Sequence, residues 1–183
     1  PLDGIHSEDA ERISKALTSL DRDEWAREWS KVGLEYEAKA EALEKSGSDR
    51  NQRRELYELA FHYFRIGRYP CAGSPGQVQS YRDSLRAFRK AAQYFDPPLE
   101  IVEVPFGDKK LIGYLQIPAG VAKPPVVMHW GGVDGWKEDR LKLAAAIMDA
   151  GLASFTIDMP GSGENPVLYG DPAAERTYLA WLD

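Results

Sequence analysis

Two short apolar runs, each followed at once by a glycine-rich turn, constrain the fold of this 183-residue chain more than any other feature. The first run and turn read PPVVMHWGGVDG over residues 124–135, and the second read GLASFTIDMPGSGE over residues 151–164. Each run has the length and apolar character of a buried strand, and the Ala- and Leu-rich residues 141–150 between them favour a helix. A strand, a helix and a strand at this spacing predict a right-handed crossover and a parallel pair of strands.

Helical periodicity dominates the first half of the chain. Apolar residues recur three and four positions apart in three stripes, and a weaker helix is expected over residues 8–20. The stripes run from Trp25 to Leu43, from Leu56 to Ile66 and from Val78 to Phe95. The middle stripe is apolar around most of its circumference, so we expect that helix to be buried on more than one side.

Capping residues mark several of the expected helix ends. Asp21 with Glu24 has the pattern of a capping box, and Ser74 followed by Pro75 is typical of another helix start. Gly47 is the expected stop of the first long helix.

The hydrophobic period changes after Asp96. Asp96-Pro97-Pro98 ends the helical part, because a residue before proline is driven out of the α region. Alternating apolar and polar residues over 99–104 and 110–117 then flank a turn at residues 106–109, which predicts a β-hairpin. We therefore expect two domains, a helical domain over residues 1–96 and an α/β domain over residues 97–183.

The composition argues against several classes of protein. A long charge-free apolar stretch is absent and no leader pattern opens the sequence, so we expect neither a membrane span nor secretion. Nine basic residues lie between Arg50 and Lys90, but they interleave with apolar residues at helical spacing. We interpret them as the solvated side of helices and expect no nucleic-acid partner. The single cysteine, Cys71, cannot form an internal disulfide, which favours a cytoplasmic setting.

Two motifs and the order of the expected elements carry a resemblance to a known family. GGVDG over residues 131–135 is followed by Lys137-Glu138, and DMPGSGE over residues 158–164 ends the next strand. With a hairpin before them, these motifs resemble the α/β-hydrolase fold. With the helical first half, the chain resembles the branch that contains the fermentation–respiration switch protein, 2,6-dihydroxypseudooxynicotine hydrolase and the yellowish-green pigment hydrolases. The resemblance implies an α/β fold, with an N-terminal helical cap domain before the first strands of the hydrolase sheet and incomplete without a further segment.

The resemblance further implies a serine hydrolase that cleaves an ester or a carbon–carbon bond next to a carbonyl, with a Ser-Asp-His triad and without a metal or organic cofactor. No G-x-S-x-G nucleophile elbow occurs in the sequence. We therefore expect the nucleophile, acid and base on a second chain or a C-terminal segment, and the chain alone to be inactive. The expected substrate is a small carbonyl compound, and association into a homo-oligomer stays open.

The family pattern, carried over onto this sequence, assigns the oxyanion loop. The backbone N–H of Val133 is the expected donor, with Gly132 or Asp134 as the neighbouring alternatives in the loop. Such a donor stabilises the negative charge that develops on a carbonyl oxygen during acyl transfer. The alternative is that Gly131 and Gly132 only permit a tight turn between a strand and a helix. The expected substrate-binding residues are Trp130, Asp134, His62 and Tyr63.

Other polar residues receive plainer interpretations. His129 ends a strand where the family's catalytic histidine never lies, so we expect it to shape the pocket floor. Ser162 is expected to bond its own turn, and Asp158 with Glu164 to brace the loop. For His62, a satisfied buried histidine competes with substrate contact.

Two other classes of protein compete with the hydrolase. The helices after Asp49 have lengths comparable to tetratricopeptide units, which would make the chain a helical-repeat protein-binding module fused to a small α/β domain. One pair of helices is too few for a stable solenoid, however, and the W-x-x-L-G signature is missing. A nucleotide-binding domain would place G-x-G-x-x-G or G-x-x-x-x-G-K-[ST] after Met128, and neither occurs there.

Overall fold

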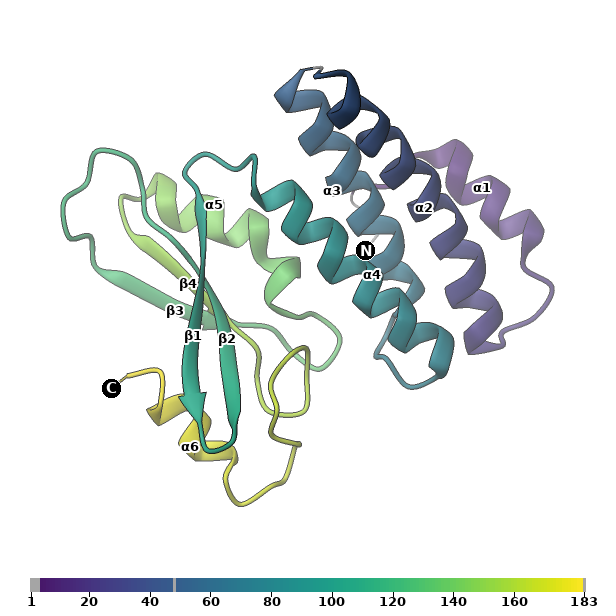
Figure 1. Ribbon diagram of the computed structural model, residues 1–183. Coiled ribbons are helices and arrows are strands. Elements are labelled where there is room, and N and C mark those ends of the chain that lie inside the picture. The colour runs from purple at the N-terminus through teal and green to yellow at the C-terminus, as the bar shows by residue number, and fades with distance from the viewer. Residues whose placement is uncertain (1–3, 48, 183) are drawn as a thin grey trace. The chain divides into compact units, whose positions relative to one another are not determined.

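The computed structural model describes residues 4–47 and 49–182 and divides into two compact units, the first ending at Phe95 and the second beginning at Asp96. The first unit consists of helices, and the second contains the strands (Figure 1). The type of secondary structure therefore changes where the hydrophobic period of the sequence changes.

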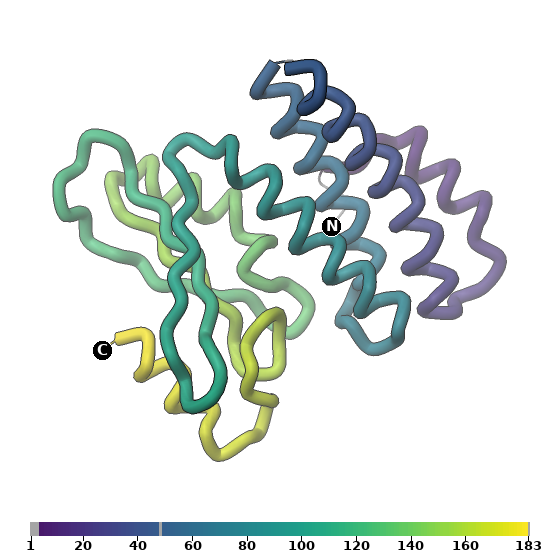
Figure 2. Tube along the Cα trace, viewed as in Figure 1, coloured from purple at the N-terminus to yellow at the C-terminus, as the bar shows by residue number. Residues whose placement is uncertain are grey.

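The helical unit is built around α3. Its elements are α1 (Ser7–Ala16), α2 (Arg22–Ser46), α3 (Arg50–Gly67) and α4 (Pro75–Ala92). α3 packs against both α2 and α4 (Figures 1 and 2). Phe61 and Phe64 of α3 are 2% and 0% exposed, and the Phe61 ring meets the Phe88 ring of α4 at 5.3 Å. The expectation that this helix is buried on more than one side is confirmed, and each such ring contributes roughly 1.5–3 kcal/mol of burial free energy.

The helix ends follow the capping residues, with one exception. The Asp21 carboxylate accepts hydrogen bonds from the Asp23 and Glu24 amides at 3.0 and 2.9 Å, and Gly47 ends α2 with a φ of 70°. The expected reciprocal half of the capping box is wrong. The Glu24 carboxylate accepts hydrogen bonds from Thr18 and Ser19 instead, because the loop before α2 brings three donors to it, while the Asp21 amide donates to Ser19 Oγ.

One four-stranded sheet forms the centre of the second unit. Its strands are β1 (Leu99–Phe106), β2 (Lys109–Gln116), β3 (Val126–Trp130) and β4 (Ala153–Ile157), in the order β1-β2-β4-β3. β1 and β2 form the expected hairpin, which turns at Gly107 with a φ of 63°. β2 pairs antiparallel with β4, and β3 pairs parallel with β4, which confirms the predicted parallel pair.

The connections place two loops at the same edge of the sheet. A short 3-10 helix, η1 (Lys137–Arg140), and α5 (Leu141–Asp149) lie between β3 and β4, and α6 (Ala174–Leu179) follows β4. Because β3 and β4 are parallel and Trp130 pairs with Ile157, the loops after these two residues leave the sheet side by side. Ligands of α/β proteins bind at this carboxyl edge.

The sheet has one exposed edge on β3. Every residue of β4 is buried, whereas Val126 and Trp130 of β3 are 59% and 45% exposed. Within residues 4–47 and 49–182, β3 has no strand on its outer side. An unpaired edge of this kind presents free backbone groups to a further strand.

Candidate active site

The loop after β3, residues 131–135, is tight at its first glycine and open at its second. A Cβ on Gly131 would lie 1.6 Å from the Gly135 carbonyl oxygen, so only glycine fits there. A Cβ on Gly132 would meet nothing closer than Asp134 Oδ1 at 3.6 Å. The interpretation of both glycines as requirements of the turn therefore holds for Gly131 alone.

The middle of this loop presents backbone donors. In the part of the chain that the structure describes, the amides of Gly132 and Val133 donate no hydrogen bond to the protein. Both residues are exposed, Val133 to 71%. The Val133 carbonyl accepts a hydrogen bond from Trp136 Nε1 at 3.1 Å, which anchors the chain just after these two amides to the protein. Such an arrangement can receive an anionic oxygen.

Trp130 and Asp134 flank the loop. The Trp130 ring lies 5.4 Å from the Tyr178 ring of α6, and its carbonyl accepts a hydrogen bond from Arg140 Nη2 at 3.2 Å. Asp134 is exposed, and its Oδ1 is the atom nearest to a Cβ built on Gly132. Substrate contact by Trp130 and Asp134 stays a prediction.

A buried ionic cluster lies immediately after the loop. Lys137, the first residue of η1, has a side chain that is 0% exposed. Its Nζ lies 2.7 Å from Glu138 Oε1, 2.7 Å from Asp158 Oδ2 and 2.8 Å from Glu164 Oε2. The Lys137 ammonium therefore has three carboxylate partners, one for each of its N–H donors.

Asp158 connects this cluster to the loop after β4. Its Oδ1 accepts a hydrogen bond from the Lys137 amide at 2.9 Å, and its Oδ2 accepts one from the Glu164 amide at 2.9 Å. A Cβ on Gly163 would lie 2.1 Å from Asp158 Oδ2, so the loop needs glycine to pass so close to the carboxylate. The expectation that Asp158 and Glu164 brace the loop is confirmed, and so is the bond from Ser162 Oγ to its own turn, at Met159 O.

Burial shifts the pKa of Glu138. Desolvation raises the pKa of this carboxyl to about 7, against the opposing attraction of Lys137. Its Oε1 also accepts a hydrogen bond from the Tyr114 hydroxyl at 3.1 Å. Sequence reasoning noted Lys137-Glu138 only as part of a motif and missed Tyr114, because nothing along the chain indicates that a strand, a 3-10 helix and a loop converge there.

His129 is directed at hydroxyl groups within the sheet. Its Nε2 lies 2.8 Å from Ser154 Oγ and 3.0 Å from Thr156 Oγ1, both on β4. Burial, and then the nearby Arg140 cation, lower the pKa of His129. These contacts agree with a supporting position below the loop.

His62 and Tyr63 lie on α3 in the helical unit. Tyr63 is 0% exposed, its hydroxyl donates to Asp9 Oδ2 at 2.7 Å, and its ring stacks on Tyr36 at 5.3 Å. His62 is half-buried, and the backbone of Gly4 lies against its ring. Substrate contact by these two residues stays a prediction.

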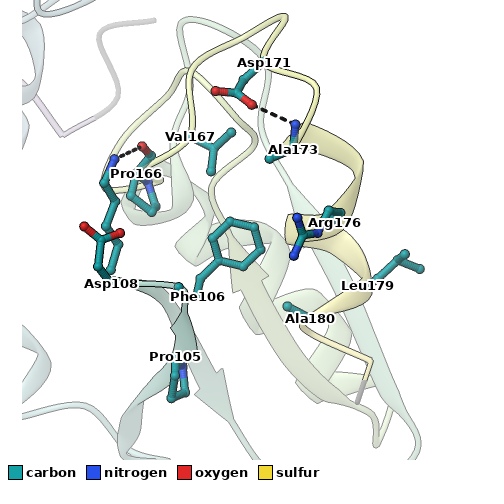
Figure 3. Close-up of a pocket in the computed structure, with 12 residues that line it drawn as sticks. Pro105, Phe106, Asp108, Pro166, Val167, Asp171, Ala173, Arg176, Leu179 and Ala180 are labelled. Carbon is teal, nitrogen blue, oxygen red and sulfur yellow. Dashed lines mark hydrogen bonds between the residues drawn. The ribbon is translucent and has the colours of Figure 1, made fainter.

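A separate hollow of about 610 Å³ lies between the hairpin turn and α6 (Figure 3). Phe106 forms its floor, with the Arg176 guanidinium 5.9 Å from the ring. No residue of the loop 131–135 lines it.

In the described ranges 4–47 and 49–182, no group of three or more His, Cys, Asp or Glu side chains could hold a metal ion. In the same ranges, every helix is too short or too polar to cross a membrane.

A helical unit followed by this sheet, with a glycine-rich loop at its carboxyl edge, has the architecture of the first part of an α/β hydrolase. The crystal structure of 2,6-dihydroxy-pseudo-oxynicotine hydrolase superimposes with a TM-score of 0.72 at 26% identity, over 89% of this chain and 45% of that one. AbyA5, at 20% identity, shows the same fold with a TM-score of 0.69 over 94% of this chain and 46% of its own.

The family follows from the sequence comparison. The chain belongs to the FrsA-like esterase family, whose profile matches residues 5–167. It is 28% identical to the alpha/beta hydrolase UcsC of an Acremonium species over 181 residues, which cover 89% of this chain and 37% of UcsC. It is also 28% identical to 2,6-dihydropseudooxynicotine hydrolase of Paenarthrobacter nicotinovorans, over 76% of this chain and 38% of that enzyme. The chain thus spans less than two fifths of the length of these curated relatives. The resemblance to this hydrolase branch and the predicted fold class are confirmed.

Proposed function

We propose that this chain is the N-terminal part of a serine hydrolase that cleaves an ester or a carbon–carbon bond next to a carbonyl group. Its loop 131–135 would supply one half of the oxyanion hole. The observation that carries this proposal is the pair of amides at Gly132 and Val133, which have no acceptor among the described residues. In the same loop, the Val133 carbonyl accepts a hydrogen bond from Trp136 Nε1.

The chemistry follows from where negative charge develops. When a nucleophile attacks a carbonyl carbon, the oxygen becomes an anion, and preorganised N–H groups lower the barrier without having to reorient. The Val133 amide is the proposed donor, with Gly132 beside it. The second donor would be the amide after the nucleophile, as in other hydrolases with a nucleophile elbow.

Substrate contact is assigned to residues around the loop. Trp130 offers an aromatic surface that is 45% exposed, and Asp134 offers an exposed carboxylate. We propose His62 of α3 as a further substrate contact, whereas Tyr63 is 0% exposed and does not reach a substrate. The Tyr63 hydroxyl is bonded to Asp9, so we assign Tyr63 to the packing of the helical unit.

The exposed edge of β3 gives the missing residues a place to attach. A second chain or a C-terminal segment with the serine, acid and histidine would pair along β3 and cover Val126, which is 59% exposed. The chain alone would then be inactive. The substrate would be a small carbonyl compound, with no cofactor or nucleic acid required. We place the protein in the cytoplasm because Cys71 is an exposed free thiol.

The family profile also bears on the alternative of a helical-repeat binding module. It runs continuously through both units, from residue 5 to residue 167. A helical module fused to an unrelated α/β domain would have no reason to match one hydrolase family over both parts. This continuity favours the hydrolase.

The test compares two substitutions at Val133 in the complete hydrolase. Val133→Pro removes the N–H donor, and Val133→Ala keeps it while removing the same exposed side chain. We expect Val133→Pro to lower kcat by about 10²–10³-fold on an aryl ester or a β-diketone, the loss typical of one oxyanion donor. Val133→Ala should stay close to the parent. If Val133→Pro is folded by its melting temperature and retains the parent's kcat, the oxyanion assignment is wrong.

A further inference from the structure

We propose that Lys137 is a positioning residue that sets the orientation of the oxyanion loop, an inference that rests on the proposed function. Its side chain is 0% exposed, so it cannot touch a substrate. It occupies the first position after the loop and Trp136, and its ammonium is bonded to three carboxylates from η1, the end of β4 and the loop after β4.

Lys137 is fixed at both its backbone and its side chain. The Lys137 amide donates to Asp158 Oδ1 at 2.9 Å, and its Nζ donates to Asp158 Oδ2 at 2.7 Å. The ammonium also lies 5.0 Å from the centre of the Tyr114 ring on β2. One residue therefore ties the chain just after the loop 131–135 to β2 and to the loop after β4.

Asp158 extends the same constraint to the neighbouring loop. Its carboxylate also holds the Glu164 amide, and its carbonyl accepts a hydrogen bond from Asn165 Nδ2 at 3.0 Å. Rotation of the chain at Lys137 would therefore break contacts in two loops at once. The amides of Gly132 and Val133 donate no hydrogen bond among the described residues, so we infer that their direction depends on this fixed end and on the bond from Trp136 Nε1 to the Val133 carbonyl.

Stability alone does not explain such a cluster. Burying one ammonium with three carboxylates costs desolvation free energy, and apolar residues of similar volume commonly give equal or greater stability. The cluster instead confers a fixed geometry, and the segment that it fixes is the one that bears the proposed donors.

The test uses Lys137→Met in the complete hydrolase, with rates expressed per reactive serine titrated by a covalent serine reagent. We expect kcat to fall about 10–100-fold with KM changed less than about 3-fold, because a displaced donor is lost chiefly in the transition state. A trifluoromethyl ketone inhibitor, which forms a tetrahedral adduct, should bind more weakly by the same factor as kcat/KM falls. A purely structural role would lower the number of titratable sites and leave the inhibition constant of the remaining sites unchanged.

The matched control is Lys110→Met. Lys110 lies in the same unit and pairs with Glu103 at 2.6 Å, but its side chain is 62% exposed, so this variant should keep the parent's kcat and inhibition constant. Because Lys137→Met leaves buried carboxylates without a cation and can fail to fold, Glu164→Gln is the second variant. It weakens one of the three ion pairs while the Glu164 amide still bonds Asp158.

The outcomes separate this inference from the proposed function. A fall in kcat and in inhibitor affinity, in folded Lys137→Met or in Glu164→Gln, supports the positioning role. If the parent is active and both variants keep its kcat and inhibition constant, Lys137 does not position the loop and the hydrolase assignment stands. The same conclusion follows if Lys137→Met does not fold and Glu164→Gln keeps both values. A parent that neither hydrolyses carbonyl substrates nor reacts with the serine reagent overturns both.

Discussion

Replacing Gly131 by alanine tests the geometry of the loop 131–135 most sharply, because Gly131 is enclosed and its neighbour Gly132 is open. The new methyl carbon would lie 1.6 Å from the Gly135 carbonyl oxygen, and real contacts of this kind do not fall below 3.0 Å. The Gly135 peptide would therefore have to move by about 1.4 Å. That atom belongs to backbone, so no side-chain rotation can relieve the clash.

The expected losses in kcat and in stability follow from this displacement. A shift of about 1 Å in a catalytic group can cost about 100-fold in rate, so Gly131→Ala should lower kcat of the complete hydrolase by about 100-fold or more. Overpacking of a well-fitted site typically costs about 1–3 kcal/mol in the free energy of unfolding, which should appear as a lower melting temperature. Steady-state hydrolysis of an aryl ester and thermal unfolding measure the two effects.

Gly132→Ala is the matched control. Its methyl carbon would sit 3.6 Å from Asp134 Oδ1, an ordinary contact, and the proposed donor N–H is retained. The free energy of unfolding should change by less than about 0.5 kcal/mol, as for most surface substitutions, and kcat should stay near that of the parent. Equal effects of the two substitutions would refute the loop geometry described here.

Three further predictions concern charge, capping and the helical core. Because burial raises the pKa of Glu138 to about 7, the folded state binds a proton that the unfolded state releases near its ordinary value of 4.5. Stability should therefore fall as pH rises from about 5 to about 8. In Glu138→Gln the melting temperature should fall less over that range, and a fall equal to that of the parent would exclude Glu138 as the cause of the pH dependence. Ser74→Ala removes the acceptor of the Gln77 amide at the start of α4 and a donor to Asp23 and should cost about 1 kcal/mol in denaturant unfolding. No loss would show that Pro75 and the Asp23 carboxylate, which accepts the Gly76 amide, suffice to start the helix. Tyr63→Phe removes one of the two tyrosine hydroxyls that bond Asp9 Oδ2, together with the acceptor of the His6 amide, and should cost roughly 0.5–1.5 kcal/mol. A neutral result would indicate that Tyr36 and Arg12 suffice to hold Asp9.

The elements that the sequence predicts well are those whose signals are local. α4 begins at Ser74-Pro75 because a side-chain acceptor and a fixed φ favour that start wherever the helix packs. The parallel pair of β3 and β4 follows from two apolar runs separated by one helix. The wide apolar surface of α3, which includes Phe61 and Phe64, predicts its burial on two sides.

The parts that sequence reasoning missed depend on residues distant in the chain. Glu24 has the position of a capping-box partner, but its carboxylate accepts hydrogen bonds from Thr18 and Ser19 instead of from the Asp21 amide. The cluster around Lys137 joins a residue of η1 to one 21 positions further on, and Tyr114 comes from a strand that precedes both. In the sequence, Lys137 belongs to the motif that follows GGVDG. Only the folded chain shows that carboxylates surround its charge.

The most direct test of the central claim is a crystal structure of the complete hydrolase bearing a phosphonate adduct on its active serine. In that structure one adduct oxygen should lie about 2.7–3.1 Å from the Val133 backbone nitrogen, the distance expected for an oxyanion-hole donor. The serine should lie outside residues 1–183, on the segment paired with β3. An adduct oxygen held by other donors, with the 131–135 loop out of hydrogen-bond reach, would contradict the account.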